Sequence, residues 1–504
     1  MHIKRSAILH LQYFNITTCL HLLTIKFSPF KMRKILTLIF CLTFGFAEIV
    51  NAGGGKPAYQ IKGNIKGITN ADVYLANYYG DKQYLKDTAH ADATGNFVFE
   101  GKPLLPGGIY LVVTPRKTYF EIIIDKEQVF SFETDSLNFI NGMKIKGSVD
   151  NELFYGYLKE GIIVQQKMDS LSKSLAAAKT KTDTTAIYDE MKKWNTHIND
   201  YRTQFIKDHP ETFLAKLFKS IPDPVVPTAP ILPNGRPDSV WSYYYYRNHY
   251  LDNVDFGDNR MLRTPVFHQK LEKFISQTVP QIPDTIIFEA DKIIARAKLD
   301  SEMFKYVIWW VTYHYETSKI MGLDAVFVHM IEKYVQTNQT WWYDSTQKAK
   351  LIERAKKISP NLIGNKAPNL KMLDMYMNPI DMSEIKSDWL IIVFWEATCG
   401  HCKKEIPKLD SLYKELLRPN GVEVWGVNLE GDQKVWMDYV NEHHLEWINV
   451  WDPYNTTNFR KSYDIYSTPV IYVLDKDRNI RYKRIDVDQV REIFEKVISD
   501  KKKK

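Results

Sequence analysis

The chain has 504 residues, too many for one hydrophobic core, and this length predicts roughly two to four folded units. Hydrophobic residues make up 44% and charged residues 25%, as in ordinary globular proteins, which gives no indication of a disordered chain or a polytopic membrane protein. The formal net charge of +7 arises at the two ends, in residues 1–52 and in four terminal lysines. The body between them is slightly acidic, so its charge does not point to nucleic acid or an anionic membrane as a partner.

Residues 1–52 have the order of features found in a secretory signal peptide. The basic start Met32-Arg33-Lys34 is followed by an apolar run at 35–47 and by a small-residue junction at Ala52. The run is shorter than the roughly 20 apolar residues of a membrane-spanning helix. We therefore expect a leader that starts at Met32 and is cleaved, and a protein exported to the periplasm or cell envelope. The alternative is an uncleaved leader, through which alone the protein would be associated with a membrane.

Residues 58–148 read as short segments of alternating hydrophobicity separated by Gly, Pro, Asn and Asp. The expected strands are Tyr59–Ile65, Asp72–Ala76, Gly95–Phe99, Ile109–Thr114, Phe120–Ile124 and Gln128–Glu133. Their spacing predicts a small antiparallel β-sandwich.

Residues 151–360 change to long runs with apolar residues three and four positions apart, which predicts an α-helical region. The expected helices are Leu158–Ala178, Ala186–Lys207, Val266–Gln277, Asp300–Ser318 and Ala325–Val335. A proline-rich break at Pro222–Pro237 predicts an ordered crossing loop. The many aromatic residues are interpreted as helix-packing core rather than as a sugar- or peptide-binding groove.

Residues 364–500 alternate apolar strands with helices. The expected strands are Trp389–Trp395, Val422–Leu429, Trp447–Val450, Val470–Leu474 and Ile480–Ile485, and the expected helices are Lys403–Leu417, Gln433–His443, Thr456–Tyr463 and Asp488–Ser499. This alternation predicts a mostly parallel sheet covered on both faces. The whole chain is thus expected to be a multidomain α+β protein with a β-sandwich, a helical middle region and a C-terminal α/β domain.

The cysteines draw attention to the C-terminal domain. Of the four cysteines, Cys19 and Cys41 lie in the leader and would be lost on cleavage. The remaining pair, Cys399 and Cys402, is so closely spaced that a disulfide between them would restrain almost no chain. The value of this pair must therefore lie in its chemistry.

The spacing of the pair supplies a nucleophile and a resolving thiol. Cys399 follows a buried strand and is expected at a helix N-terminus, where unpaired N–H groups and the helix dipole lower a thiol pKa. Cys402 lies one helical turn on, within reach of a mixed disulfide on Cys399. His401, when protonated, would stabilise the thiolate and make the couple more oxidising. A metal site would need two further Cys or His ligands, so no metal is expected.

Three segments around this pair resemble the thioredoxin-like family, and within it the TlpA-like envelope subgroup. They are Phe394–Pro407 around the cysteines, the entry segment Gly364–Leu370 and the loop Ser467–Tyr472, in the family's order. The resemblance implies a thioredoxin-like fold for residues 364–500. More weakly, Ile61–Ile65 is similar to an uncharacterised β-domain that often precedes thioredoxin domains in Gram-negative envelope proteins, which implies a docking or spacer role.

The resemblance also implies the site residues. Cys399 and Cys402 would form the redox disulfide, and Glu405 matches an acid that would accept the proton of the resolving thiol. The alternative for Glu405 is a surface residue paired with Lys408 or Lys404. The residues expected to contact the substrate are His401, Thr468, Pro469 and Trp395, with a cis peptide bond before Pro469.

The predicted function is therefore that of an envelope thiol-disulfide oxidoreductase that needs no organic cofactor. Its partners would be protein thiols and disulfides of the envelope and an upstream thiol reductant protein. One alternative is a thiol peroxidase, which shares the fold, although Glu396 and Thr398 depart from the residues expected before a peroxidatic cysteine. The other alternative is a scaffold protein that grips a partner with its N-terminal regions and carries a secondary redox domain.

Overall fold

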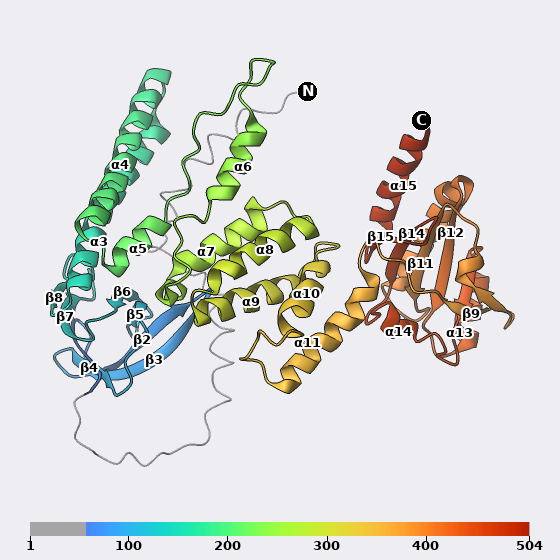
Figure 1. The fold of residues 1–504 in the computed structure, drawn as a ribbon, viewed down its shortest axis with the longest axis horizontal. Helices are drawn as coiled ribbons and strands as arrows, with labels where there is room; N and C mark the ends of the chain where they lie inside the picture. Colours follow the sequence, from blue (N-terminus) through green and yellow to red (C-terminus); the bar gives the residue numbers. More distant parts are fainter. Residues whose placement is uncertain (1–56, 503–504) are drawn as a thin grey trace, which may run out of the picture. The chain divides into compact units, whose positions relative to one another are not determined.

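The computed structural model describes residues 57–502, which form two compact units (Figure 1). Unit 1 contains the described chain up to Thr278 together with Lys298–Met303. Unit 2 contains Val279–Ala297 together with the chain from Phe304 onward. The predicted leader and its two cysteines lie outside the described residues. Within residues 57–502, no helix is both long and apolar enough to cross a membrane.

Unit 1 begins with two four-stranded sheets, ordered β4-β1-β7-β8 and β3-β2-β5-β6. The strands are β1 (Tyr59–Lys66), β2 (Ala71–Tyr79), β3 (Lys82–Ala91), β4 (Asn96–Gly101), β5 (Gly108–Val113), β6 (Tyr119–Ile124), β7 (Val129–Asp135) and β8 (Lys144–Lys146). The purely antiparallel arrangement expected from the sequence is wrong for one pair, because β1 and β7 run parallel. The chain between these two strands passes through the other sheet and returns in the same direction, which is the connection that parallel neighbours require.

Strand β3 was not expected from the sequence, because it is an edge strand with mostly exposed side chains. It pairs with β2 alone in its sheet. An edge strand with little buried surface needs no period-two alternation, so its sequence carries no strand pattern. By contrast, β1 alternates between buried and more accessible residues along its length, as its sequence predicts.

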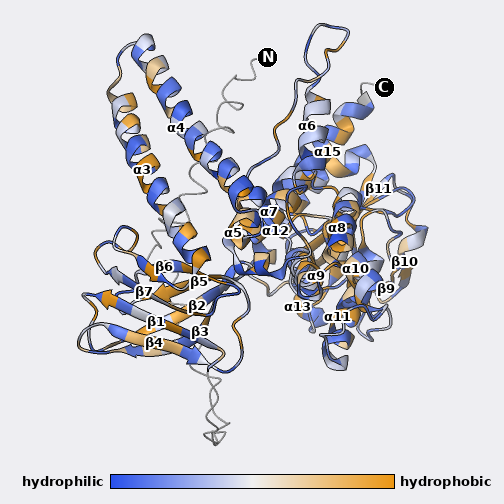
Figure 2. Cartoon of the chain, turned by 60° about the vertical axis from the view of Figure 1, so that its left-hand side comes forward, coloured by the Kyte–Doolittle hydropathy of each residue, from blue (hydrophilic) through white to orange (hydrophobic). Residues whose placement is uncertain are grey.

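A long helical hairpin follows the sheets, formed by α3 (Val149–Ala177) and α4 (Lys181–Asp208), which lie side by side (Figure 2). The Ser148 side chain caps α3 by accepting from Asn151 N, and the Thr180 side chain caps α4 in the same way. The base of α3 is fixed to β6, because the Asn151 amide accepts from Ile123 N at 2.8 Å and donates to Ile123 O at 2.6 Å. The hairpin is therefore attached to the sheet by paired hydrogen bonds.

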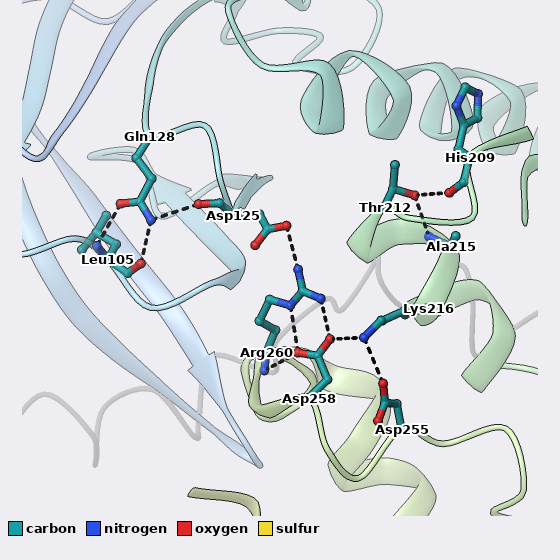
Figure 3. Close-up of polar contacts among 10 residues, drawn as sticks. All are labelled: Leu105, Asp125, Gln128, His209, Thr212, Ala215, Lys216, Asp255, Asp258 and Arg260. Carbon is teal, nitrogen blue, oxygen red and sulfur yellow. Dashed lines mark hydrogen bonds and ion pairs between the residues drawn. The ribbon is translucent and has the colours of Figure 1, made fainter. Parts of the chain in front are cut away.

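Short helices complete unit 1: α5 (Phe213–Ser220), α6 (Ser239–His249) and α7 (Pro265–Lys273), with a 3-10 turn at Asn259–Arg263. A charged network joins α5 and the 3-10 turn to Asp125, which follows β6 (Figure 3). Arg260 donates to Asp125 at 2.7 Å and to Asp258 at 2.8 Å, and Lys216 of α5 contacts Asp258 at 2.9 Å and Asp255 at 3.0 Å. Because Asp258 is buried, Arg260 and Lys216 together supply the charge that its carboxylate needs.

The helices of unit 2 are α8 (Pro283–Ala297), α9 (Ser301–Glu316, whose first residues belong to unit 1), α10 (Asp324–Met330) and α11 (Ser345–Ile358). Helices α5, α6, α8 and α11 were not among those expected. Two of them lack a strong apolar stripe: α6 buries no residue, and α11 buries only Ala355 and Ile358. Helix α5 is only eight residues long, which leaves little periodicity to detect.

The C-terminal part of unit 2 is a seven-stranded sheet, ordered β10-β9-β13-β12-β11-β14-β15. Its strands are β9 (Lys371–Asp374), β10 (Pro379–Asp381), β11 (Trp389–Trp395), β12 (Val422–Asn428), β13 (Ile448–Trp451), β14 (Val470–Asp475) and β15 (Ile480–Lys483). Only β11, β12 and β13 pair in parallel, and the flanking strands pair antiparallel. The expectation of a mostly parallel sheet is therefore corrected to a mixed sheet with a parallel centre.

Strand β11 lies at the centre of this domain and is buried on both faces. Ile391, Val393 and Trp395 join one core cluster, while the alternate residues 390, 392 and 394 join the other. The helices α12 (Cys402–Leu412), α13 (Gln433–Glu442), α14 (Phe459–Ser462) and α15 (Val487–Lys502) complete the domain. The mixed α/β architecture with helices around a central sheet is the thioredoxin-like arrangement expected from the sequence, and the α+β fold class is confirmed.

Candidate active site

The two cysteines lie where β11 ends and α12 begins. Cys399 N donates to Glu396 O at 3.3 Å, so a tight turn follows the strand, and Lys403 N donates to Cys399 O at 3.0 Å. Helix α12 starts at Cys402. Gly400, between them, has open space around it, so the turn is unhindered. The strand, turn and helix thus bring both thiols to one end of the sheet.

The two thiols differ in exposure. Cys399 is partly exposed, whereas Cys402 is 1% exposed. Burial raises the pKa of the Cys399 thiol, but hydrogen bonds to its thiolate from the Thr468 side chain, the Cys402 backbone and thiol, and the His401 backbone outweigh burial, so the pKa lies below its ordinary value. Burial, together with the neighbouring Cys399, raises the pKa of Cys402 to about 12. One thiol is therefore accessible and acidic, and the other is shielded and held protonated.

The loop before β14 approaches the accessible thiol. The Thr468–Pro469 peptide bond is cis. Cys399 Sγ lies 3.6 Å from Thr468 O, and its thiol donates to that carbonyl. Residues 69 positions apart in the chain are thus neighbours at the site.

Glu405 lies three residues after Cys402 on α12, and such a spacing places both on the same helix face. Its Oε1 contacts Lys408 Nζ at 2.9 Å, so the predicted surface pair is present. Its Oε2 is buried and has no hydrogen-bond partner among residues 57–502. The carboxylate therefore has one oxygen in a surface ion pair and one directed away from solvent.

Two further residues near the cysteines are exposed, and one expected contact residue is not. The His401 side chain is exposed, and Thr398 Oγ1 donates to Glu430 at 2.6 Å. Trp395, by contrast, has no exposed surface and packs against Tyr439 with ring centroids 5.3 Å apart. The expectation that Trp395 contacts the substrate is therefore wrong, because β11 is covered on both faces and leaves none of its last residues at the surface.

Sequence reasoning missed a set of residues that hold the Thr468 loop in place. The carboxylate of Asp464 accepts from Arg354 of α11 at 2.7 Å and from Arg484 at 2.9 Å. Asn361 donates to Ser462 O at 2.7 Å. The helical region of unit 2 thus contacts the loop four residues before Thr468. Nothing in the local sequence pattern distinguishes Arg354 from the other basic residues of its helix.

No group of three or more His, Cys, Asp or Glu residues in the described part of the chain is arranged to hold a metal ion. His443 caps the C-terminal end of α13 and stacks on Tyr439 with ring centroids 3.9 Å apart. Its Nδ1 lies 3.0 Å from Tyr439 O.

Comparison with known families divides the chain into three matches. Residues 363–483 match the AhpC/TSA family. Residues 59–154 and 163–361 match two families described as domains of unknown function, DUF4369 and DUF5106.

Curated relatives match the C-terminal part of the chain. The thiol-disulfide oxidoreductase ResA of Bacillus cereus is 26% identical over 133 residues, which are 26% of this chain and 75% of that protein. ResA of Bacillus subtilis is 32% identical over 117 residues, 23% of this chain and 52% of that protein. Among solved structures, a domain of a possible thiol-disulfide isomerase from Cytophaga hutchinsonii is 35% identical, with a TM-score of 0.27, and the match covers 28% of this chain and 97% of that domain.

Proposed function

Since residues 363–483 belong to the AhpC/TSA family and the chain is a thioredoxin-like thiol-disulfide oxidoreductase related to ResA, we propose that it reduces or exchanges protein disulfides of the cell envelope through Cys399 and Cys402. The observation that carries the proposal is the asymmetry of the two thiols, one accessible with a lowered pKa and one buried with a raised pKa. The envelope location rests on the predicted leader.

The reaction follows from this asymmetry. The Cys399 thiolate attacks one sulfur of the substrate disulfide, a mixed disulfide forms, and the other substrate sulfur leaves as a thiolate that takes up a proton. Cys402 then loses its proton and attacks Cys399 Sγ, which releases the second substrate thiol and forms the Cys399–Cys402 disulfide. The substrate gains two electrons and the protein loses two. An upstream thiol reductant protein returns the pair to the dithiol.

Glu405 is proposed as the proton acceptor for the second step. A thiol with a pKa of about 12 has almost no thiolate near neutral pH, so Cys402 needs a base in order to attack. Glu405 lies on the same helix face, and its buried Oε2 has no other hydrogen-bond partner among the described residues. These two features favour the catalytic interpretation over a purely surface pair with Lys408.

The exposed edge beside Cys399 is proposed as the substrate surface. Thr468 offers a backbone carbonyl next to the Cys399 sulfur, where an extended substrate segment could pair with it. His401 is exposed two residues after Cys399 and, when protonated, would stabilise the thiolate. Pro469, the residue after Thr468, is proposed as part of the same substrate surface.

The central test traps the intermediate. In Cys402→Ala the mixed disulfide on Cys399 cannot be resolved, so we expect reducible adducts with envelope proteins, identified by mass spectrometry. The double variant Cys399→Ala/Cys402→Ala is the control and should give none. If Cys402→Ala reacts normally with a small disulfide reagent and yet forms no adduct in cells, the oxidoreductase proposal fails.

Glu405 is tested by comparing two variants of the same ion pair. Glu405→Gln keeps the side-chain shape and removes the base, so release of substrate from the mixed disulfide should slow by about tenfold or more, while the first attack changes little. Lys408→Met breaks the same surface pair but leaves the carboxylate. Stopped-flow kinetics measures the first attack and the release of substrate in both variants. If Glu405→Gln and Lys408→Met change these two steps equally, Glu405 is only a surface partner of Lys408.

The AhpC/TSA match favours one second candidate, a thiol peroxidase. In that reaction Cys399 would attack a peroxide, form a sulfenic acid, and be resolved by Cys402 with release of water. Consumption of hydrogen peroxide by the reduced protein, compared with Cys399→Ala, tests this candidate.

A further inference from the structure

Unit 1 contains a cavity of about 410 Å³ that takes no part in the redox chemistry. It lies between the sheet strands β5 and β6 and the helices α3, α4 and α5. The volume falls within the roughly 300–1,000 Å³ of small-molecule sites and well above the roughly 150 Å³ of an engineered cavity that binds benzene. The cavity is therefore large enough for a small organic ligand.

The walls of this cavity are mainly apolar. Phe154 and Leu158 contribute from α3, Ile198 from α4, Leu214 and Leu217 from α5, and Ile109 from β5. All six side chains are otherwise buried, so the space that they leave favours a hydrocarbon body over water.

The lining includes two acidic residues, of which Glu121 lies on the sheet and Asp223 lies beyond α5. Glu121 stands in the middle of β6, among five apolar and aromatic residues, and is only 6% exposed. Tyr78 of β2 donates to its Oε1 at 2.8 Å. Among the described residues Tyr78 is the one hydrogen-bond donor to this carboxylate, and no Lys, Arg or His forms an ion pair with it.

The titratable groups that interact with Glu121 are tyrosines. Besides Tyr78 they are Tyr119 on the same strand and Tyr155 of α3, whose hydroxyl donates to the Glu121 carbonyl at 2.8 Å. Burial raises the pKa of Glu121 to about 7, although the hydrogen bond from Tyr78 opposes this. A buried carboxylate without a cation is costly, and an added positive charge at this position would offset that cost.

The other charged residues of the lining already have protein contacts. Arg202 of α4 donates to Tyr157 Oη at 2.6 Å and to Asn199 Oδ1 at 3.3 Å. Asp223 accepts from Lys273 at 2.8 Å and from Lys270 at 3.3 Å. Glu121 thus differs from Asp223, which has two cationic partners.

We propose that this cavity binds a lipophilic amine, with its apolar body between α3, α4 and α5 and its ammonium group against Glu121. The ammonium supplies the cation that the protein does not place beside this carboxylate, and the hydrocarbon part fills the apolar space. The site lies wholly in unit 1, so the proposal is independent of the disulfide chemistry of Cys399.

The test compares three probes that share one chain length. Octylamine, octanol and octanoate are titrated into the full mature protein by isothermal calorimetry at pH 8.5. We expect one saturable site per chain, with octylamine bound at least about tenfold more tightly than the other two, because only the amine pairs with Glu121. Lowering the pH to 5.5 protonates Glu121 and should weaken octylamine binding while leaving octanol binding unchanged.

Two helix variants provide a matched control. Gly161 of α3 lines the cavity, and a Cβ added there would meet nothing within 4 Å, so Gly161→Leu should fill the space without a clash. Gly156 of the same helix does not line the cavity, and its added Cβ would make an ordinary contact with Tyr201. Both changes favour the helix, so Gly161→Leu should abolish binding of all probes, whereas Gly156→Ala should leave it within twofold.

Glu121→Gln completes the experiment. It should weaken octylamine binding by about tenfold or more at pH 8.5 and leave octanol binding within twofold. Tighter binding of octanol or octanoate than of octylamine would overturn the assignment of an amine. Absence of saturable binding, or binding that survives in Gly161→Leu, would overturn the site itself.

Discussion

The redox pair of unit 2 and the cavity of unit 1 each contain a buried acidic group whose pKa is raised by the same physical cause. Burial raises the pKa of Cys402 to about 12 and that of Glu121 to about 7. Their surroundings differ. Cys402 has a second thiol, Cys399, three residues before it and with a lowered pKa. Glu121 borders an apolar cavity and accepts a hydrogen bond from Tyr78.

The difference teaches that burial alone does not make a reactive site. In the proposed reaction the shielded proton of Cys402 matters, because resolution of the mixed disulfide on Cys399 requires that this proton leave. At Glu121 no nucleophile is present, so the shielded carboxyl can only respond to what enters the cavity or to pH. In our proposals the first site transfers electrons and protons, and the second site recognises a ligand.

The largest effect is expected from removing the nucleophile. Cys399→Ala should lower the rate of protein-disulfide reduction by at least about a thousandfold, because no other described cysteine is accessible. The rate is measured as turnover of a disulfide-linked substrate with a thiol reductant. Glu121→Gln should have full activity. Loss of activity in Glu121→Gln would break the separation between the two regions.

The framework around the cavity is the next target. Arg260→Met leaves the buried Asp258 without its main cation and should destabilise unit 1 by about 3 kcal/mol or more. Chemical denaturation measures this free energy of unfolding. Lys193→Met, which removes an exposed helix pair with Glu190, is the control and should cost less than about 1 kcal/mol. Similar effects of the two variants would show that the Arg260 network adds no more than a surface pair.

The pH dependence of stability sharpens the comparison at Glu121. Because its folded pKa is raised to about 7 from 4.5, its stabilising contribution is fully present below pH 4.5 and is lost as the pH rises through 7. The loss should amount to roughly 3 kcal/mol between pH 4.5 and 9. Denaturation of the wild type and of Glu121→Gln across this range measures it.

Asp258 provides the opposite sign within the same unit. Burial raises its pKa, but the hydrogen bonds and charges of Arg260 and Lys216 outweigh burial and lower it to about 2. Its contribution is therefore present above its unfolded pKa of 3.8 and is lost as the pH falls towards 2.

A wild-type stability that does not change between pH 4.5 and 9 would contradict the raised pKa of Glu121.

The smallest effect is expected at the contact between α11 and the Thr468 loop. Arg354→Met removes one of the two arginines on Asp464 and should cost about 1 kcal/mol, since Arg484 remains. Amide exchange of Ile465, whose N–H donates to Arg460 O at 2.8 Å, should become several-fold faster. Arg418→Met, which breaks an exposed pair with Glu446, should leave this exchange unchanged.

Much of the redox site could be predicted from the sequence because its parts are local. The apolar strand, the two cysteines and Glu405 lie within seventeen consecutive residues, 389–405. Helix spacing places Cys402 and Glu405 on one face of α12. The place of the Thr468 loop at the site was predicted from a family resemblance, because residue spacing alone does not indicate it. Within this segment Trp395 was misjudged, because its burial depends on helices packed against both faces of β11.

The sequence by itself determined the order of a β-rich, a helical and an α/β region, which depends on hydrophobic periodicity, and it predicted the redox pair from short spacing. Only the tertiary structure decided that β1 and β7 run parallel, that Asp464 contacts α11, and that Glu121 borders a cavity built from three helices. These features join residues dozens of positions apart. The free energy of such contacts depends on which surfaces pack together after folding. Local sequence patterns therefore do not predict these contacts.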